Sequence, residues 1–309
     1  MLSRIAESLY WIGRYVERAE DTCRILDVHL QLMVDDPSTD PQESATTLLA
    51  VLGMPGTTGP VAPEELLTML QYDHTSTCSV LASLEGAREA ARRARETVSP
   101  EMWESLNATW NAVRAGQLRR MRPVAGLTYV RERCALIAGM ADSTMSHDEG
   151  WHFLRLGRAI ERVDMSARLM LWAAVSRRSS SAWNNALRAC GAIHAFRRTH
   201  GAATLDEDAA EFLLVDRLFP RSVVYSLTMA ESALAELEPG SLRSGFDSEA
   251  LRILGRARTE LEYEPLSELL TELPEALARL QQVCISVDAA ISQRYFVGAL
   301  SPAWTGGGV

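Results

Sequence analysis

A six-residue motif occurs twice in this sequence, at positions far apart in the chain, and it limits the folds that the sequence can adopt. Gly13–Arg18 (GRYVER) is matched by Gly157–Arg162 (GRAIER), a shift of 144 positions (157 − 13 = 144). A second stretch repeats at a shift of 143 (216 − 73 = 143), where residues 73–87 resemble residues 216–230. Two separate matches at nearly the same shift predict a tandem duplication in which each half is one copy of a structural unit.

The segments between these matches have the pattern of α-helices. Apolar residues recur at spacings of three and four, and clusters of proline and glycine separate the segments. Aromatic residues make up only 6% of the chain, and few of the alternations that strands need are present. We therefore predict an all-α fold with helices over about 3–34, 41–53, 63–73, 77–97, 100–116, 123–146, 149–178, 182–199, 206–218, 220–238, 246–264 and 266–297.

The repeat also predicts how the chain is divided. We expect one all-helical domain over 1–297, built from repeats at about 1–120 and 145–297 that are joined by 121–144, and a disordered tail over 298–309. Duplicated halves usually pack about a pseudo-two-fold axis, by analogy with symmetric assemblies. That fold class, a tandem-duplicated helical bundle, would bring the two motif helices close together.

Composition and charge exclude several classes of function. The net charge of −9, from 31 basic and 40 acidic residues, argues against nonspecific binding to nucleic acid. The chain has no run of about 18 apolar residues and no secretory signal at its start, so we expect no membrane span and a cytoplasmic location. The five scattered cysteines form no Cys-x-x-Cys pair, which indicates reduced core thiols and no metal site.

The two motif helices differ in a way that predicts buried charges. In the first copy, Arg14, Glu17, Arg18, Asp21 and Arg24 share one stripe of about 120° at the helical repeat, opposite an apolar face. Alone, this pattern is typical of an amphipathic surface helix. The second copy is apolar nearly all round, with its charges embedded among residues such as Leu154 and Trp172. Buried charges persist only when they are paired or hydrogen-bonded, so we expect these side chains to have partners.

Two roles for the motif residues remain open at this point. In one, the charges cross-pair at the centre of the fold and fix how the halves dock, with Glu17, Glu161, Arg24 and Arg168 in a structural network. In the other, the motif arginines outnumber the two motif glutamates and bind a phosphate or carboxylate in a cleft. The candidate anion-binding residues are Arg14, Arg18, Arg158 and Arg162. Gly13 and Gly157 would let another backbone or a ligand approach closely.

Other residues offer weaker candidates for chemistry. The sequence has no phosphate-binding glycine loop, and the spacing of His147 and His152 points their rings apart, so a cap and loop before the 149–178 helix is the favoured interpretation. The repeated serines, Ser79 and Ser222, are expected to cap helices or to form buried hydrogen bonds. The repeated aspartates, Asp73 and Asp216, are expected to be structural residues at helix ends. Glu17 and Glu161 are the weak candidates for a general base.

Three parts of the chain resemble a known family. The opening Met1–Glu20, the second motif segment Gly150–Arg162 and the segment Phe219–Val223 closely resemble the bacterial alpha-E domain family, and the likeness runs from residue 1 to about 297. One departure is His147–Asp148, where the family pattern would have Arg-Asp. The resemblance implies a cytoplasmic system that makes or modifies peptides or amide-linked compounds, because members are encoded beside or fused to ATP-grasp-type ligases and transglutaminase-like proteins. ATP and Mg²⁺ would be used by the partner ligase, with no cofactor in this chain.

These observations leave three hypotheses for function. The first is a helical partner of an ATP-grasp-type amide ligase that binds an anionic or peptide-like intermediate between its paired Arg/Glu helices. The second is an enzyme in its own right, a hydrolase or transferase acting on the ligase product, with Glu17 or Glu161 as the base. The third is a non-catalytic scaffold whose charged core only docks the two halves.

Overall fold

Helices make up nearly all of the chain that the computed structural model describes, which is residues 1–35, 40–54, 61–175, 182–201, 205–238 and 248–296. The first part contains α1 (Ser3–Asp35), α2 (Pro41–Val51), α3 (Pro63–Leu67), the π-helical segment η1 (Thr68–Tyr72), α4 (Val80–Arg93), α5 (Pro100–Arg114), α6 (Gln117–Arg120) and α7 (Pro123–Thr144). The second contains α8 (Glu149–Val175), α9 (Ala182–Ala189), α10 (Ile193–His200), α11 (Asp206–Val215), α12 (Val223–Leu237), α13 (Glu249–Tyr263), α14 (Leu266–Thr271) and α15 (Leu273–Tyr295). These ranges contain no strand, so the predicted all-α class is confirmed.

Serine caps set the starts of four of these helices. The hydroxyl oxygens of Ser79, Ser99, Ser222 and Ser248 each accept a hydrogen bond from the backbone N–H three residues later. Such caps satisfy a backbone donor that the first turn of a helix leaves without a partner. The starts of α4, α5, α12 and α13 therefore follow directly from local sequence.

Two helices that we predicted as continuous are interrupted. The 182–199 segment divides into α9 and α10 at Gly191, whose φ of +68° suits glycine and ends the first helix. The 266–297 segment divides into α14 and α15 at Glu272, just before Pro274, which has no N–H to continue the preceding helix. The predicted disordered tail at 298–309 lies outside the described residues, as do positions 176–178, 246–247 and 297 of predicted helices.

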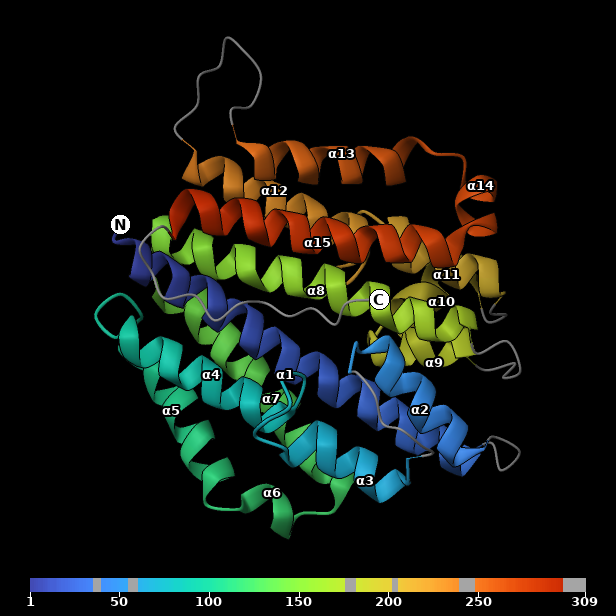
Figure 1. Ribbon diagram of the computed structural model, residues 1–309, viewed down its shortest axis with the longest axis horizontal. Helices are drawn as coiled ribbons and strands as arrows, with labels where there is room; N and C mark the ends of the chain where they lie inside the picture. The colour runs from blue at the N-terminus through green and yellow to red at the C-terminus, as the bar shows by residue number, and fades with distance from the viewer. Residues whose placement is uncertain (36–39, 55–60, 176–181, 202–204, 239–247, 297–309) are drawn as a thin grey trace.

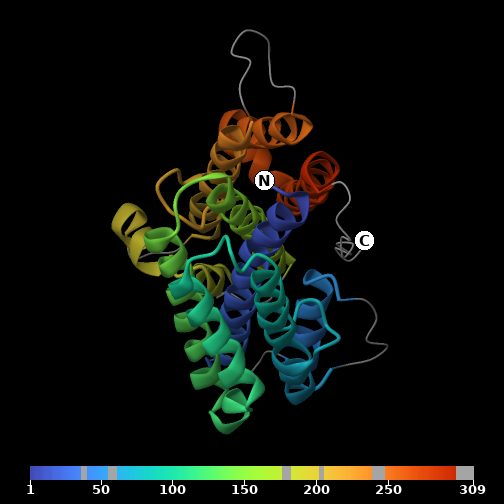
Figure 2. The same ribbon diagram turned by 90° about the vertical axis from the view of Figure 1, so that its left-hand side faces the viewer.

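The long helices α1 and α8 pack against each other at the centre of the molecule (Figure 1). On one side of this pair, α4 and α7 contact α1, and α5 packs on both of them. On the other side, α12 and α15 contact α8, and α13 packs on both of them. The view turned by 90° in Figure 2 also shows these two groups on either side of α1 and α8. The motif residues therefore lie between two layers of helices rather than on a solvated face.

The crossing of α1 and α8 depends on the motif glycines. A Cβ atom at Gly13 would lie 2.1 Å from the backbone oxygen of Leu154, and one at Gly157 would lie 2.0 Å from that of Tyr10. Both distances are far inside van der Waals contact, so only a hydrogen atom fits at either position. The predicted close approach of another backbone to these glycines is confirmed, and that backbone belongs to the other motif helix.

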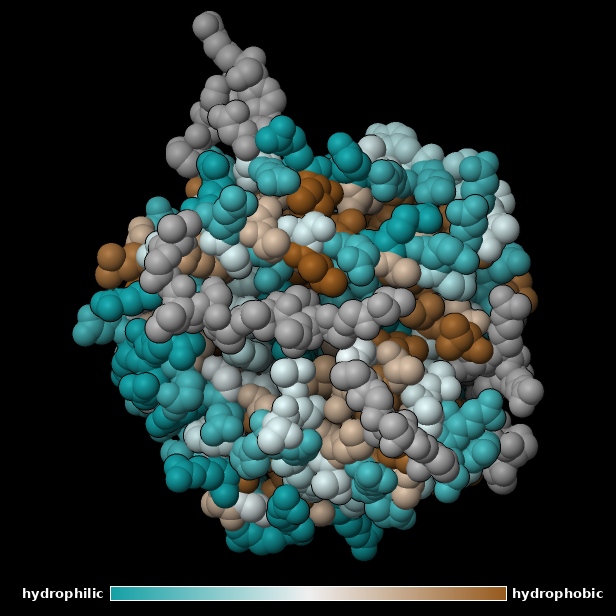
Figure 3. All heavy atoms as spheres, viewed as in Figure 1, coloured by the Kyte–Doolittle hydropathy of each residue, from teal (hydrophilic) through white to brown (hydrophobic). Residues whose placement is uncertain are grey.

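The rest of the described chain is typical of a helical core with a mixed surface. All five cysteines are free thiols, and four of them are buried. None of the described helices combines the length and the apolar character that crossing a bilayer requires. On the face shown in Figure 3, apolar side chains are interspersed with polar ones, and the strongly exposed apolar residues Val34, Leu218 and Tyr263 lie on separate elements.

Candidate functional site

The two motif helices exchange a pair of bidentate ion pairs. Arg18 of α1 donates through Nε to Oε1 of Glu161 at 2.5 Å and through Nη2 to Oε2 at 2.9 Å. In the opposite direction, Arg162 of α8 donates through Nε to Oε1 of Glu17 at 2.6 Å and through Nη2 to Oε2 at 2.8 Å. Both glutamates are buried, and each pair has the fork geometry that suits a guanidinium and a carboxylate. The contact between the helices is therefore reciprocal at the level of individual atoms.

The remaining donors of these two arginines are also used in equivalent ways. Nη1 of Arg18 donates to the backbone oxygen of Thr77 at 3.3 Å, just before α4. Nη1 of Arg162 donates to the backbone oxygen of Pro220 at 3.1 Å, just before α12. Each arginine thus connects the opposite motif helix to the loop that precedes a capped helix of its own half of the chain.

The first arginine of each motif reaches a carboxylate on a helix that packs against the other motif helix. Arg14 is fully buried; its Nε donates to Glu161 at 2.7 Å and its Nη1 to Asp288 of α15 at 2.6 Å, where the Tyr10 hydroxyl also donates at 2.7 Å. Arg158 is partly exposed and lies 3.4 Å from Asp142 of α7. Arg14 is therefore tightly bound within the core, whereas the contact of Arg158 with Asp142 is long and lies near the surface.

A further cation, Arg221, joins this network at the end of the loop before α12. Its guanidinium contacts Glu17 at 3.0 Å, Asp21 at 2.5 Å and Glu20 at 2.6 Å. Glu20 also pairs with Arg24 at 2.7 Å. The predicted network member Arg168 pairs instead with Asp164 at 2.9 Å and donates to the backbone oxygen of Val51 at 3.0 Å.

Burial and these charges set the protonation of the acidic groups. Burial alone would raise the pKa of Glu17, but Arg162 and Arg221 lower it to about 2. Burial opposes the ionisation of Glu161 in the same way, and Arg18 and Arg14 nevertheless hold its pKa below the ordinary value. Burial, together with the charges of Glu17 and Glu20, raises the pKa of Asp21 to about 7 against the effect of Arg221. At neutral pH the two motif glutamates are ionised, which makes them weak proton acceptors.

These contacts divide the four arginines that we predicted as anion-binding residues into two pairs with different surroundings. Counting only the motif, arginines exceed glutamates, but the structure adds carboxylates from outside it: Asp288 on Arg14, Asp142 near Arg158 and two more on Arg221. Arg14 and Arg18 hold protein carboxylates in the core. Arg158 and Arg162, by contrast, line a cleft that opens at the surface.

This cleft, which we call the arginine cleft, lies between α8 and the start of α12. It has a volume of about 240 Å³ and is lined by Arg155, Arg158, Ala159, Arg162, Pro220, Tyr225, Ser226 and Met229. Three of these residues are cationic and none is acidic. The cleft therefore carries positive charge beside a wall that is partly apolar, an arrangement that suits a small anionic group.

Of the three arginines in the cleft, Arg155 has the least negative charge close to its guanidinium. In the part of the chain that the structure describes, no carboxylate lies within ion-pair distance of its guanidinium, which contacts the sulfur of Met229 at 2.8 Å and lies 5.0 Å from the centre of the Trp151 ring. Partial burial and the charge of Arg158 lower the pKa of Arg155. The negative charge of an anion in the cleft would favour the charged form of Arg155 and so offset both of these unfavourable effects.

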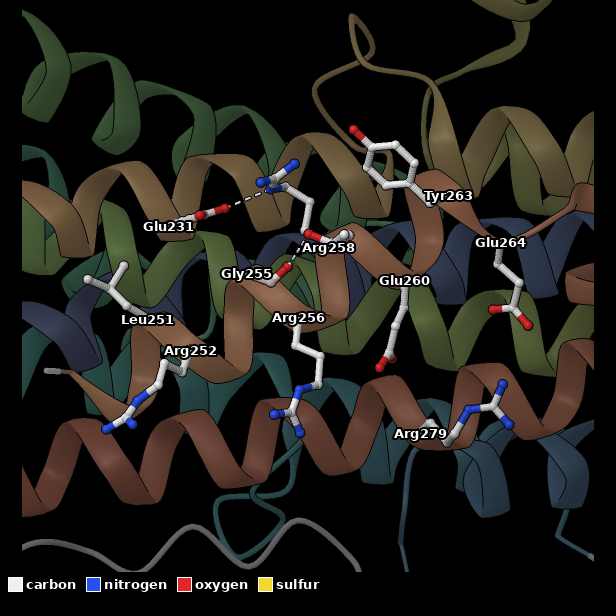
Figure 4. Close-up of a pocket in the computed structure, with 11 residues that line it drawn as sticks. Glu231, Leu251, Arg252, Gly255, Arg256, Arg258, Glu260, Tyr263, Glu264 and Arg279 are labelled. Atoms are coloured by element: carbon white, nitrogen blue, oxygen red, sulfur yellow. Dashed lines mark hydrogen bonds and ion pairs between the residues drawn. The ribbon is translucent and has the colours of Figure 1, made fainter. Parts of the chain in front are cut away.

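A larger groove lies between α12, α13 and α15, and it differs from the arginine cleft in its charge (Figure 4). Its volume is about 960 Å³, and it mixes arginines with glutamates along its walls. Arg258 pairs there with Glu231 at 2.7 Å and also contacts Glu262. This groove contains no motif residue, and its four lining arginines are accompanied by three lining glutamates, so it has no comparable excess of positive charge.

The weaker candidates from the sequence have structural roles. Oδ1 of Asp148 accepts from the backbone N–H of Gly150 at 2.9 Å, so it caps α8, while the ring of His147 stacks on Trp151 with 3.8 Å between centroids. The hydroxyls of Ser79 and Ser222 cap α4 and α12 and also donate to the backbone oxygens of Asp73 and Asp216, each at 2.5 Å. Within the described residues no group of three or more His, Cys, Asp or Glu side chains is arranged to hold a metal ion.

Comparison of the chain with known proteins shows a family that it matches. A family model named Alpha-E, a predicted alpha-helical domain with a conserved ER motif, matches residues 1–296. The chain is 29% identical over 341 residues to an uncharacterized protein of Mycobacterium bovis and to one of Mycobacterium tuberculosis. These matches cover 97% of this chain but only 38% of each relative, so the chain spans well under half of their length. No solved structure matches the chain.

Proposed function

The chain belongs to the alpha-E family, and on that premise we propose that it is a helical partner of an ATP-grasp-type amide ligase that holds an anionic or peptide-like intermediate in the arginine cleft. The observation that carries the proposal is the cleft itself, because Arg155, Arg158 and Arg162 line it without an acidic residue. A preorganised set of guanidinium groups in a small cleft favours a carboxylate or a phosphate.

The buried network supports this function by fixing the position of the cleft. Arg162 lines the cleft while its Nε and Nη2 donate to Glu17 and its Nη1 donates to Pro220. Its position is thus set by α1 and by the loop before α12 together. The structural and anion-binding roles are therefore combined: Arg14 and Arg18 stabilise the crossing, and Arg158 and Arg162 face the ligand.

The proposal includes a tandem duplication whose halves are related by a pseudo-two-fold axis. In its support, the Arg18–Glu161 and Arg162–Glu17 pairs are reciprocal, as are the contacts of the two motif glycines. Helix α7 packs on α1 and α5 in the way that α15 packs on α8 and α13. We therefore assign α7 to the first half, in place of a separate joint at 121–144.

The partner is proposed from the family and from the length of the relatives. Members of the family are similar in being encoded beside or fused to ATP-grasp-type ligases and transglutaminase-like proteins. The curated relatives have more than half of their length beyond the part that matches this chain, which leaves room for further domains. In this proposal the ligase uses ATP and Mg²⁺ in the cytoplasm, and this chain contributes the binding of the intermediate.

The test is reconstitution of the chain with an ATP-grasp-type ligase from the same genome, with amide formation measured against ATP consumption. Arg158→Met should lower the coupled activity about tenfold or more, because it removes a charged donor from the cleft. Arg256→Met, which removes an exposed charge from the α13 groove, is the matched control and should leave the rate unchanged. Full coupled activity in a folded Arg158→Met variant, or a ligase whose activity is indifferent to this chain, would refute the proposal.

An enzymatic role for Glu17 or Glu161 is the alternative, and the geometry favours it less. Both carboxylates are buried, both accept two bonds from an arginine, and both have lowered pKa values. A general base needs an accessible oxygen and a pKa near the working pH. The scaffold alternative explains the network but gives no reason for the charge of the arginine cleft.

A further inference from the structure

The two halves have different residues at equivalent positions beside the motif arginines. With the shifts of 144 and 143, Trp11 corresponds to Arg155, Tyr15 to Ala159 and Gly86 to Met229. In the first half, the Tyr15 ring lies directly over Gly86, where an added Cβ atom would meet ring carbons at 2.9 Å. The equivalent of the arginine cleft is therefore filled by an aromatic side chain.

The aromatic side chains of the first half also cover the motif arginines. The guanidinium carbon of Arg14 lies 5.4 Å from the Trp11 ring centre, and that of Arg18 lies 5.7 Å from the Tyr15 ring centre. These are cation–π distances, so the rings both exclude water and stabilise the charges. The first half thus needs no external anion at this position.

In the second half the same position is open. Ala159 has no ring to fill the space, so the cleft of about 240 Å³ remains, and Arg155 adds a charge where the first half has an indole. Where the first half has the Tyr15 ring, the second half therefore has an open cleft with one additional cation, Arg155. The replacement of a tyrosine by an alanine alone would leave an apolar gap. The additional arginine indicates that the cleft binds an anion.

We propose, resting on the function proposed above, that the arginine cleft is a subsite for a terminal carboxylate on an amino-acid-sized group, with Arg155 as the residue that determines specificity. The cleft has little positive charge left for a ligand, because Arg162 already pairs with Glu17 and Arg158 has a long contact with Asp142. A singly charged, planar carboxylate matches this, and a guanidinium can hold it with two bonds.

The size and the walls of the cleft define the rest of the ligand. A volume of about 240 Å³ lies below the range of roughly 300–1,000 Å³ that accommodates drug-sized ligands. Ala159, Pro220 and Met229 line the cleft and provide an apolar wall for a short stem, and the aromatic residue Tyr225 also lines it. The ligand is therefore the end residue of a peptide-like chain, entering with its carboxylate first.

The experiment is a titration of the purified 309-residue chain, by calorimetry or NMR, with three probes: N-acetylalanine, N-acetylalaninamide and inorganic phosphate. The acid should bind and the amide, which lacks the negative charge, should bind about tenfold or more weakly. Equal binding of acid and amide would overturn the proposal. Tighter binding of phosphate than of the acid would assign the cleft to a phosphoryl group and overturn the carboxylate assignment.

Variants that copy the first half make the test specific. Ala159→Tyr introduces the aromatic ring of the first half and should abolish binding of N-acetylalanine, and Arg155→Met should weaken it about tenfold or more. Arg155→Gln gives a second variant if either of these fails to fold, and it should weaken binding similarly. Arg256→Met is the matched control for charge and should bind as the wild type does. Wild-type affinity in folded Arg155→Met or Arg155→Gln protein would overturn the proposal.

The outcome also separates this proposal from the function on which it rests, since the titration needs no ligase. Binding that depends on Arg155 together with a ligase that ignores the chain would refute only the partnership. A coupled system that depends on Arg158 while Arg155→Met binds normally would refute only the carboxylate subsite.

Discussion

Replacing a motif glycine by alanine should reverse the usual effect of that substitution on a helix. Within a helix, Gly→Ala ordinarily stabilises a protein by up to about 1 kcal/mol, because alanine loses less backbone entropy on folding. At Gly157, however, the new Cβ would lie 2.0 Å from the backbone oxygen of Tyr10 and 2.9 Å from its carbonyl carbon. Neither atom can rotate away, since both belong to the backbone of α1.

The size of this overlap gives the expected loss of folding stability. An ordinary contact needs about 3.4 Å or more, so α1 and α8 would have to separate by more than about 1 Å at the crossing. The ion pairs from Arg18 to Glu161 and from Arg162 to Glu17 span that crossing at 2.5–2.9 Å and would lengthen. Hydrogen bonds to charged groups each contribute roughly 1.5–3 kcal/mol, so we expect Gly157→Ala to destabilise the fold by about 3 kcal/mol or more.

The assay is urea denaturation at neutral pH, followed by circular dichroism, on Gly157→Ala, Gly13→Ala and the control Gly139→Ala. Gly139 lies within α7, and no atom would be near an added Cβ, so this variant should be slightly more stable than the wild type. Gly13→Ala should match Gly157→Ala, since its Cβ would lie 2.1 Å from the backbone oxygen of Leu154. If Gly157→Ala were as stable as Gly139→Ala, α1 and α8 would not need a glycine where they cross.

Two further predictions concern the buried carboxylates. Glu161→Gln should destabilise the protein by about 3–5 kcal/mol, because Arg14 and Arg18 would lose their shared anion in the core, whereas the exposed Glu132→Gln should have little effect; equal midpoints of urea denaturation would contradict this. The pKa of Glu17 is lowered from 4.5 to about 2, so its contribution is complete above pH 4.5 and is lost as the pH falls toward 2. Stability measured from pH 6 to pH 3 should therefore fall more steeply in the wild type than in Glu17→Gln, and identical slopes would contradict the pairing.

Much of the fold could be predicted from local sequence, because caps, prolines and apolar spacing act within a few residues. The start of α12 follows from Ser222, and that of α5 from Ser99 with Pro100. The interruption at Gly191 was missed because the apolar spacing continues across it, and only a positive φ separates α9 from α10. Side chains on the motif helices could be predicted to need partners, because the second copy is apolar on nearly every side.

The identity of those partners could not be predicted, since it depends on contacts between distant parts of the chain. Asp288 lies 274 positions from Arg14, and its only signal is a lone acid between apolar neighbours on α15. Arg221 occurs in the segment that resembles the family, but nothing local indicates that it reaches α1. Arg155 was missed as a site residue, although its alignment with Trp11 in the repeat was available as a signal.

Carboxylates hold the motif guanidinium groups in the core, and NMR of the arginine side chains measures whether they do. Nε of Arg14, Arg18 and Arg162 each donates to a buried carboxylate at 2.5–2.7 Å. These three Nε–H groups, assigned with Arg→Lys variants, should therefore exchange with D₂O far more slowly than that of the exposed Arg256. Exchange of all three as fast as that of Arg256 would show that these guanidinium groups are not held by buried carboxylates.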